Sequence, residues 1–221
     1  MRPVLIRQHV ESAPPGLLAE WLEARGIPYE VSRSWEDGPL PDPAGYAFVV
    51  SLGHTGGPND THDPAVVSEL ALLREAVERD VPVLGLCFGG EALAAVLGGR
   101  VERAPVAELG WRTVESSAPD AIPAGPWLEW HFERFTLPPG ATELARTADA
   151  TQAFRLGPHL GVQFHPEATV EIVEGWAAHD GVEAELAASP EQREAARAAA
   201  FRLFDAFLSA PRATRDPSGT R

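Results

Sequence analysis

The sequence predicts an α/β protein with a mostly parallel central sheet and a small antiparallel extension. In the first half of the chain, short apolar runs alternate with segments whose apolar residues recur at helical spacing, a pattern typical of βαβ units. The second half holds shorter candidate strands between Pro/Gly turns such as Leu137-Pro138-Pro139-Gly140, which favours antiparallel pairing. The length of 221 residues fits one domain, and no internal repeat or low-complexity linker divides it.

In the first half, cap residues and apolar periodicity together set the predicted elements. Gly26 is a typical C-terminal cap, and Asp63 followed by Pro64 is a typical helix start. We expect strands over residues 4–7, 28–31, 46–52 and 82–86, and helices over residues 17–25 and from residue 64 onward.

The second half is predicted to end in two helices. Strands are expected over residues 112–115, 152–156 and 160–164, and helices over 170–178 and 190–208. Ser189-Pro190-Glu191-Gln192 is a capping-box pattern at the start of the last helix. From Pro211 the chain is polar and lacks apolar periodicity, so we expect one domain over residues 1–210 and a flexible tail over residues 211–221.

Composition excludes several classes of function. With 18 basic and 32 acidic residues the formal charge is −14, so nucleic acid is an unfavourable partner. The 18 basic residues are all arginines, which excludes P-loop, Schiff-base and pyridoxal chemistry because each needs a lysine. The single cysteine forbids an internal disulfide and favours a reducing compartment. Since no apolar stretch approaches the ~18 residues of a membrane span, we expect a cytoplasmic protein that binds neither membrane nor nucleic acid.

The segment around Cys87 carries the strongest chemical signal. Gly85-Leu86-Cys87-Phe88-Gly89 joins a predicted strand to a predicted helix through a Gly-x-Cys-x-Gly turn. The glycines allow the strained turn of a nucleophile elbow, and a helix N-terminus favours thiolate over thiol. The backbone N–H of Phe88 would face a developing oxyanion. A free cysteine is more often a small buried apolar residue, but the flanking glycines favour the nucleophile here.

A cysteine nucleophile needs a base and an orienting group, and the segment Gly161-Val162-Gln163-Phe164-His165-Pro166-Glu167 offers both. Residues two apart in an extended chain lie on the same side, so Glu167 would fix the tautomer and charge of His165. Taken alone the His-Pro-Glu segment fits a surface turn; beside a nucleophile elbow it favours catalysis. The glycine-rich turn over residues 51–59 would present a second N–H to the oxyanion, although such turns are a weak signal.

Other polar and aromatic residues show less specific patterns. His54, His62 and Asp63 lack a metal-ligand spacing, so we expect neither a metal nor a cofactor. Four large aromatic side chains either line the edge of a pocket or belong to the core: Trp111, Trp127, Trp130 and Phe132.

Six segments follow one another in a fixed order over most of the chain. They are Gly56-Gly57-Pro58, Pro82-Val83-Leu84-Gly85-Leu86-Cys87-Phe88-Gly89, Glu108-Leu109-Gly110-Trp111, Trp130-His131-Phe132-Glu133, Gln152-Ala153-Phe154-Arg155 and Gly161-Val162-Gln163-Phe164-His165-Pro166-Glu167. In this order they resemble class I glutamine amidotransferases, and among them the stand-alone domains that are similar to the amidotransferase half of GMP synthase.

The resemblance implies a flavodoxin-like three-layer sandwich and a Cys-His-Glu triad. Cys87 would attack the γ-carboxamide of glutamine, His165 would shuttle protons and Glu167 would orient His165. Carried over by position, the oxyanion hole would be the backbone N–H groups of Gly57 and Phe88. The same resemblance implies that Gly110, Trp111 and Glu91 bind substrate. It also implies a structural role for His131 and Glu133 in the segment Trp130-His131-Phe132-Glu133.

One position departs from the family pattern. Four residues after the nucleophile the family usually has glutamine, which helps to hold the amino-acid head of the substrate, whereas this chain has Glu91. A carboxylate would accept a hydrogen bond from the ammonium of the substrate but repel its α-carboxylate. The alternative is that Glu91 only stabilises the start of its helix.

Three functions follow from the resemblance. The first is a glutaminase that supplies ammonia to a separate synthase subunit, since the chain contains no lysine for a P-loop ATP site. The second is a stand-alone γ-glutamyl hydrolase acting on γ-glutamyl amides or conjugates, which Glu91 favours. The third is a non-catalytic binding or regulatory member of the fold, against which the retained Cys87, His165 and Glu167 argue.

Overall fold

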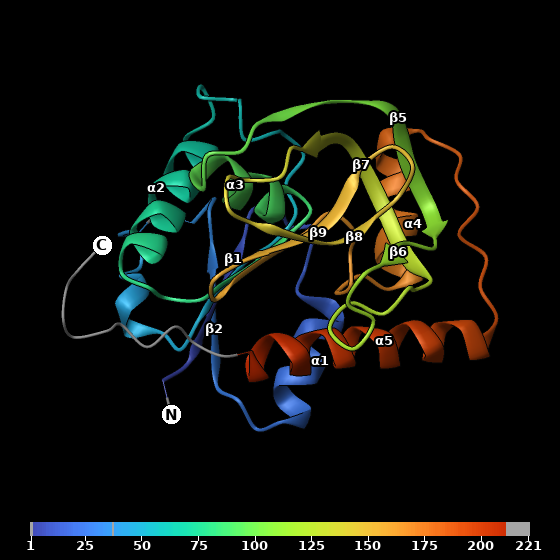
Figure 1. Ribbon diagram of the computed structural model, residues 1–221, viewed down its shortest axis with the longest axis horizontal. Coiled ribbons are helices and arrows are strands. Elements are labelled where there is room, and N and C mark those ends of the chain that lie inside the picture. The colour runs from blue at the N-terminus through green and yellow to red at the C-terminus, as the bar shows by residue number, and fades with distance from the viewer. Residues whose placement is uncertain (1, 37, 211–221) are drawn as a thin grey trace.

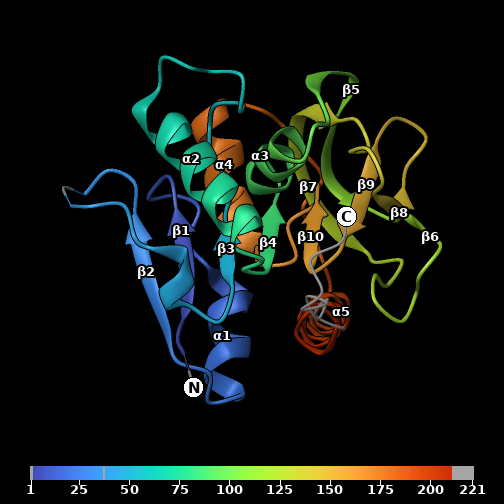
Figure 2. The same ribbon diagram turned by 60° about the vertical axis from the view of Figure 1, so that its left-hand side comes forward.

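The parallel half of a large sheet forms the centre of the molecule. The computed structural model describes residues 2–36 and 38–210. In this part of the chain an eight-stranded sheet has the order β2-β1-β3-β4-β10-β9-β8-β6. Its parallel strands are β1 (Val4–Gln8), β2 (Tyr29–Arg33), β3 (Val49–Ser51), β4 (Val83–Leu86) and β10 (His159–Val162). Figure 2 shows these five strands side by side.

Antiparallel pairing begins at β10 and continues to one edge of the sheet. The strands are β9 (Thr151–Leu156), β8 (Thr142–Arg146) and the short β6 (Glu115–Ser116). A separate two-stranded sheet pairs β5 (Val101–Arg112) with β7 (Trp127–Phe135), and its register shifts between Arg103 and Glu108. Residues of β7 in this second sheet lie near the carboxyl ends of the parallel strands.

Helices cover both faces of the large sheet and so give three layers. Figure 1 shows α2 (Pro64–Glu78) and α3 (Phe88–Val96) on the upper side, and α1 (Gly16–Ala24) and α5 (Pro190–Ser209) on the lower side. Each side has its own apolar cluster, with Trp21 and Phe204 in one and Leu73 and Phe88 in the other. A third cluster packs α4 (Val170–Asp180) against the two-stranded sheet, and a short 3-10 helix, η1, spans Pro43–Gly45.

The predicted fold class is confirmed, together with several local details. Asp63 caps α2 by accepting a hydrogen bond from the N–H of Ala65, and Ser189 caps α5 by accepting one from Gln192. Gly26 follows α1 with a φ of 62°, as expected of a C-terminal cap residue. The expected tail over residues 211–221 lies outside the described residues.

The extent of the antiparallel part was predicted poorly. The expected strand over residues 112–115 is wrong, because β5 ends at Arg112 and β6 begins at Glu115. The long strands β5 and β7 were not predicted at all. Buried and exposed residues do not alternate regularly along either strand, because each strand is covered by neighbouring elements over only part of its length.

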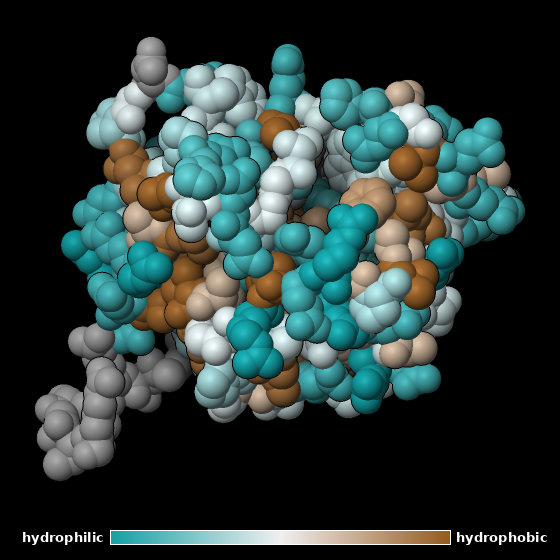
Figure 3. Space-filling model, turned by 90° about the horizontal axis from the view of Figure 1, so that it is seen from above, coloured by the Kyte–Doolittle hydropathy of each residue, from teal (hydrophilic) through white to brown (hydrophobic). Residues whose placement is uncertain are grey.

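The surface mixes charged and apolar side chains. Exposed large apolar residues include Val67 on α2, 49% exposed, and Val106 on β5, 57% exposed. Figure 3 shows apolar groups separated by hydrophilic ones on the face seen from above. Over residues 2–36 and 38–210, none of the helices combines the length and the apolar character needed to cross a bilayer.

Glycines let α3 lie directly against the sheet. A Cβ at Gly89 would lie 2.1 Å from the backbone oxygen of Ser51 in β3, and one at Gly90 would lie 2.4 Å from the backbone oxygen of Val162 in β10. Both distances are far below any real Cβ contact, and the obstacles are backbone atoms that cannot rotate away. The start of α3 is therefore fixed between the two strands that flank β4.

We expect Gly89→Ala to destabilise the protein by about 1–3 kcal/mol, because α3 must move away from β3 to make room. Gly175→Ala is the matched control, since Gly175 lies exposed in the interior of α4 with no atom within 4 Å of an added Cβ. That variant should gain about 0.5–1 kcal/mol from the better helix propensity of alanine. Urea unfolding of both variants measures the difference, and equal effects would contradict the close packing at Gly89.

Candidate functional site

Cys87 lies at a sharp backbone turn between β4 and α3. Its φ is 51° and its ψ is −111°, a strained conformation for a residue with a side chain. The turn is held because the N–H of Cys87 donates to the backbone oxygen of Val162 at 2.9 Å. It also needs Gly85, where a Cβ would lie 2.3 Å from the backbone oxygen of Gly89. The side chain of Cys87 is thereby presented at the N-terminus of α3, as the sequence predicts for an elbow.

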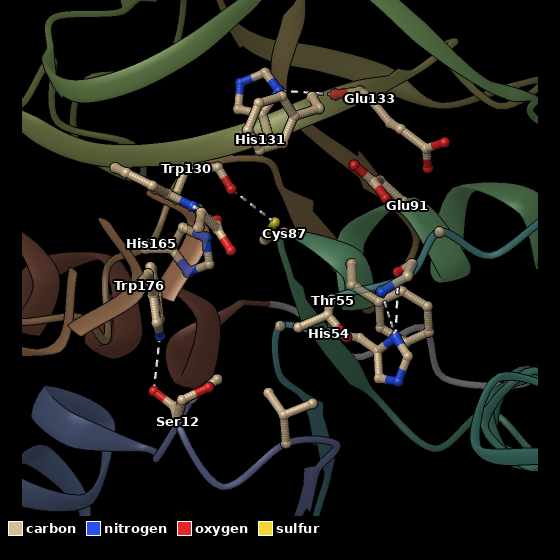
Figure 4. Close-up of a pocket in the computed structure, with 18 of the residues that line it drawn as sticks. Ser12, His54, Thr55, Cys87, Glu91, Trp130, His131, Glu133, His165 and Trp176 are labelled. Atoms are coloured by element: carbon tan, nitrogen blue, oxygen red, sulfur yellow. Dashed lines mark hydrogen bonds between the residues drawn. The ribbon is translucent and has the colours of Figure 1, made fainter. Parts of the chain in front are cut away.

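His165 and Glu167 follow β10 and are joined by a hydrogen bond. His165 Nδ1 lies 2.8 Å from Glu167 Oε1, and both residues are buried. The carboxylate can only accept, so Nδ1 carries the proton and donates. Nε2 of His165 is buried without a hydrogen-bond partner among the described residues. Figure 4 shows the imidazole beside Cys87, which is the arrangement that a proton transfer between the two side chains requires.

Electrostatics favours the protonated form of His165. Burial lowers the pKa of His165, but the carboxylate of Glu167 and the interaction with Cys87 raise it by more. The resulting pKa lies well above the ordinary value of 6.5. An imidazolium beside a thiol stabilises the thiolate, the nucleophilic form of cysteine.

A cavity of about 230 Å³ opens beside Cys87, His165 and Glu91. Its lining comes from the segments that follow β1, β3, β4 and β10, from the start of α3, and from β5, β7 and α4. In a parallel sheet the carboxyl ends of the strands meet at one edge, which is where such folds bind ligands. Besides the three residues named, the described lining is Val10, Ser12, Ala13, Gly53, His54, Thr55, Gly56, Gly57, Phe88, Arg103, Trp130, His131, Phe132, Glu133, Trp176, His179 and Asp180.

Gly57 and Phe88, whose backbone N–H groups are the predicted oxyanion donors, both line this cavity. Phe88 is the first residue of α3, and the N–H groups of a first helical turn have no partner within the helix. Gly57 lies on the loop after β3, where the carboxylate of Glu133 packs directly against it: a Cβ at Gly57 would lie 2.0 Å from Glu133 Oε2. Only glycine fits at this position while Glu133 keeps its place.

Glu91 lies in the first turn of α3 and faces the cavity. Gln163 Nε2 donates to Glu91 Oε1 at 2.8 Å, and Glu91 is only 4% exposed. Burial raises the pKa of Glu91 to about 7, the hydrogen bond from Gln163 opposes this rise, and the charge of Glu133 adds to it. Figure 4 shows the carboxyl groups of Glu91 and Glu133 pointing toward each other. This end of the cavity is therefore acidic, and Glu91 changes its charge near neutral pH.

His131 and Glu133, predicted to be structural, both line the cavity. Nδ1 of His131 lies 2.7 Å from the backbone oxygen of Glu133, while Nε2 lies 3.3 Å from Glu108 and 3.4 Å from Glu129. Burial lowers the pKa of His131, but the hydrogen bonds to Glu108 and Glu129 outweigh it and raise that pKa to about 10. The sequence analysis did not predict this raised pKa, because the partners of His131 come from two different strands.

Two of the predicted substrate-binding residues do not reach the cavity. Trp111 lines a separate surface groove together with Glu185, and its Nε1 donates to the backbone oxygen of Leu186 at 3.1 Å. Gly110 has a φ of 80°, and an added Cβ would lie 2.9 Å from the backbone oxygen of Glu185. Both residues hold the segment before α5 against β5, so their placement argues against a role in binding substrate.

The aromatic residues that the sequence left open divide between core and cavity. Trp127 is core: its ring stacks on Phe164 at a centroid distance of 4.5 Å. Trp130 and Phe132 line the cavity, and so does Trp176, which the sequence analysis missed. The ring of Trp176 lies 4.6 Å from that of His165. The helical spacing of the apolar residues around Trp176 predicted a helix, but it gave no sign that this face of α4 packs over the carboxyl edge of the sheet.

The polar residues considered as metal ligands do not assemble. His54 Nε2 lies 3.4 Å from Asp63 Oδ2, whereas His62 is exposed. Across residues 2–36 and 38–210, His, Cys, Asp and Glu side chains form no group of three that could hold a metal ion.

The fold and the site define an α/β protein of the cysteine-nucleophile type, with an elbow cysteine facing an imidazole and carboxylate pair. The model of one protein family, glutamine amidotransferase class-I, matches residues 53–174. The chain belongs to the class I glutamine amidotransferase family.

Curated relatives support the same family. A GMP synthase [glutamine-hydrolyzing] of Thermomicrobium roseum is 40% identical over 121 residues, which are 51% of this chain and 22% of the relative. One of Aeropyrum pernix is 34% identical over 153 residues, which are 62% of this chain and 28% of the relative. The chain thus spans about a quarter of the length of these relatives.

Solved structures match over nearly the whole chain. A glutamine amido transferase from Methylobacillus flagellatus superimposes with a TM-score of 0.83 at 28% identity and covers 98% of both chains. A glutamine amidotransferase from Thermotoga maritima gives a TM-score of 0.82 at 24% identity, over 95% of this chain and 100% of the other, and shows the shared fold.

Glu167→Gln is expected to lower the pKa of His165 by about one to three pH units, because it removes the negative charge that favours imidazolium. An NMR titration of the His165 ring measures the change directly. Glu171→Gln is the control, since Glu171 is an exposed residue on the following helix. An unchanged pKa in Glu167→Gln would show that the carboxylate does not set the charge of His165.

Proposed function

We propose that the protein hydrolyses the γ-carboxamide of glutamine through a γ-glutamyl thioester on Cys87 and supplies the ammonia to a separate synthase. The observation that carries this proposal is the meeting of Cys87, the His165–Glu167 pair and the residues Gly57 and Phe88 at one small cavity. A cavity of about 230 Å³ suits a substrate of amino-acid size rather than a large one.

In the first half-reaction the Cys87 thiolate attacks the amide carbon of glutamine. Negative charge then develops on the former carbonyl oxygen, which the N–H groups of Gly57 and Phe88 are placed to stabilise. His165 gives its Nε2 proton to the leaving nitrogen, so ammonia departs and the thioester remains. Glu167 keeps His165 in the orientation and charge state that this transfer needs.

In the second half-reaction water resolves the thioester. The neutral imidazole of His165 accepts a proton from water as its oxygen attacks the acyl carbon. The C–S bond breaks, and the thiolate and imidazolium pair is restored with the release of glutamate. The sum is glutamine plus water to glutamate plus ammonia, without a cofactor.

The names of the relatives support a synthase as the consumer of the ammonia. The relatives are named GMP synthases, and the chain spans about a quarter of their length. We infer that the ammonia passes to a synthase site outside the residues of this sequence, because these residues offer no lysine for a P-loop ATP site. We propose the cytoplasm as the compartment of the reaction, since a nucleophilic cysteine must stay reduced.

A stand-alone γ-glutamyl hydrolase is the second candidate. It is favoured by Glu91 and by the apolar and aromatic lining on the His165 side of Cys87, formed by Val10, Ala13 and Trp176. A substituent on the leaving nitrogen would lie on that side, since His165 protonates the leaving group. A non-catalytic role would leave the strained turn at Cys87 without a purpose.

Glutamate release from L-glutamine and from γ-glutamyl amides by the purified chain separates these candidates. Glutaminase activity that disappears in Cys87→Ala supports the proposal, and preference for a substituted amide favours the hydrolase. Cys87→Ala should lose at least about 10³-fold in kcat because the thioester cannot form. Activity that survives in Cys87→Ala would overturn the mechanism.

The affinity for glutamine should depend on the charge of Glu91. Below pH 7 the neutral carboxyl group can donate to the α-carboxylate of glutamine, whereas above it the ionised form repels that group. KM should therefore rise roughly tenfold between pH 6 and pH 8, as the protonated fraction falls.

Glu91→Gln provides the matched control for this pH effect. It keeps the size and the donor of the neutral acid but cannot ionise, so its KM should stay nearly constant over the same range. Steady-state kinetics at several pH values measures both proteins. The same rise of KM in Glu91→Gln would assign the pH dependence to another group.

A further inference from the structure

We propose that His54 is a positioning residue that fixes the two backbone amides of the oxyanion hole, those of Gly57 and Phe88, relative to each other. The inference rests on the proposed function, because it assigns a role in that same reaction. It starts from the loop after β3, in which His54 precedes Gly56 and Gly57.

The first contact fixes the loop itself. The N–H of Gly56 donates to Nδ1 of His54 at 2.8 Å. A backbone N–H can only donate, so Nδ1 must be unprotonated. The closed turn sets the direction of the next peptide, whose N–H belongs to Gly57. The backbone oxygen of Gly56, in that same peptide, lies 3.3 Å from Nδ1.

The second contact selects the tautomer. With Nδ1 unprotonated, the proton of a neutral ring is on Nε2, which lies 3.4 Å from Asp63 Oδ2. Asp63 is itself fixed, because its Oδ1 caps α2 by accepting from the N–H of Ala65 at 2.8 Å. The N-terminus of α2 thereby orients His54 as Glu167 orients His165.

The third contact reaches the side chain of the residue that carries the other amide. The ring of His54 lies 5.1 Å from the ring of Phe88, centroid to centroid, and the side chain of His54 is 7% exposed. His9 packs against both rings, at 5.9 Å from His54 and 5.1 Å from Phe88. One imidazole therefore contacts the residue before Gly57 and the residue that carries the second amide.

One further histidine and two aspartates lie around the ring of His54. His9 is the other titratable ring that packs against His54, and burial lowers its pKa to about 4, so it stays neutral. Asp63 faces Nε2, and Asp60 lies on the far side of Gly56, with Oδ2 4.0 Å from the position of an added Cβ. A proton on Nδ1 would oppose the Gly56 N–H and release the turn.

Two substitutions separate the hydrogen bond from the ring contact. His54→Phe keeps an aromatic ring against Phe88 but loses the acceptor, whereas His54→Asn keeps an acceptor for the N–H two residues ahead, as in an Asx-turn. We expect His54→Phe to lower kcat about 10- to 100-fold, somewhat less than the loss of a whole oxyanion donor, with KM nearly unchanged. His54→Asn should recover most of the lost kcat. Equal losses in both variants, or a change confined to KM, would overturn the proposal.

His62→Phe is the control, since His62 is an exposed histidine on the same loop and should tolerate the change. A second measurement does not depend on turnover. Long-range ¹H–¹⁵N NMR of the intact chain should show His54 as the neutral tautomer with its proton on Nε2. A proton on Nδ1 would overturn the positioning role. A wild-type chain without Cys87-dependent hydrolysis would instead count against the proposed function.

Discussion

The strained turn at Cys87 is the constraint on which the rest of the site depends. Cys87 keeps its positive φ only because the surrounding backbone restrains it in that conformation. The N–H of Cys87 is tied to β10, and α3 lies against β3 and β10 through glycines that admit no Cβ. Moving any of these strands would move the thiol, so the parallel sheet serves as the rigid frame of the chemistry.

The electrostatic design around this turn combines charges of opposite sign. Buried carboxylates raise the pKa of His165 and the pKa of His131 on the side of the thiol. Glu91 and Glu133 make the other end of the cavity acidic. The arrangement separates recognition of the substrate from activation of the nucleophile.

The sequence predicted those parts of the fold that depend on neighbouring residues. The elbow around Cys87 and the caps at Asp63 and Ser189 are set within a few positions, and each is found as expected. The pairing of β5 with β7 was missed, because it joins residues that lie between 15 positions (Arg112 and Trp127) and 34 positions (Val101 and Phe135) apart, in segments whose pattern does not alternate.

The site, like the fold, was predictable only where its geometry depends on residues close together in the sequence. The pair His165 and Glu167 lies two residues apart, so its geometry could be inferred, whereas the cavity walls from α4 and the loop after β1 depend on tertiary packing. Glu133 gave no local signal because its carboxylate meets Gly57 only in the folded chain. The position of Gly110 and Trp111 away from the cavity has the same cause, since their partners lie in the segment before α5.

The position of the single cysteine has a practical side. Because Cys87 is the only thiol of the chain and lines the cavity, a small thiol-directed fluorine label would report from this one place without mutagenesis. Its resonance would sense the rings of Trp130, Trp176 and His165 around it. The proposed nucleophile is thus also a unique labelling site for spectroscopy.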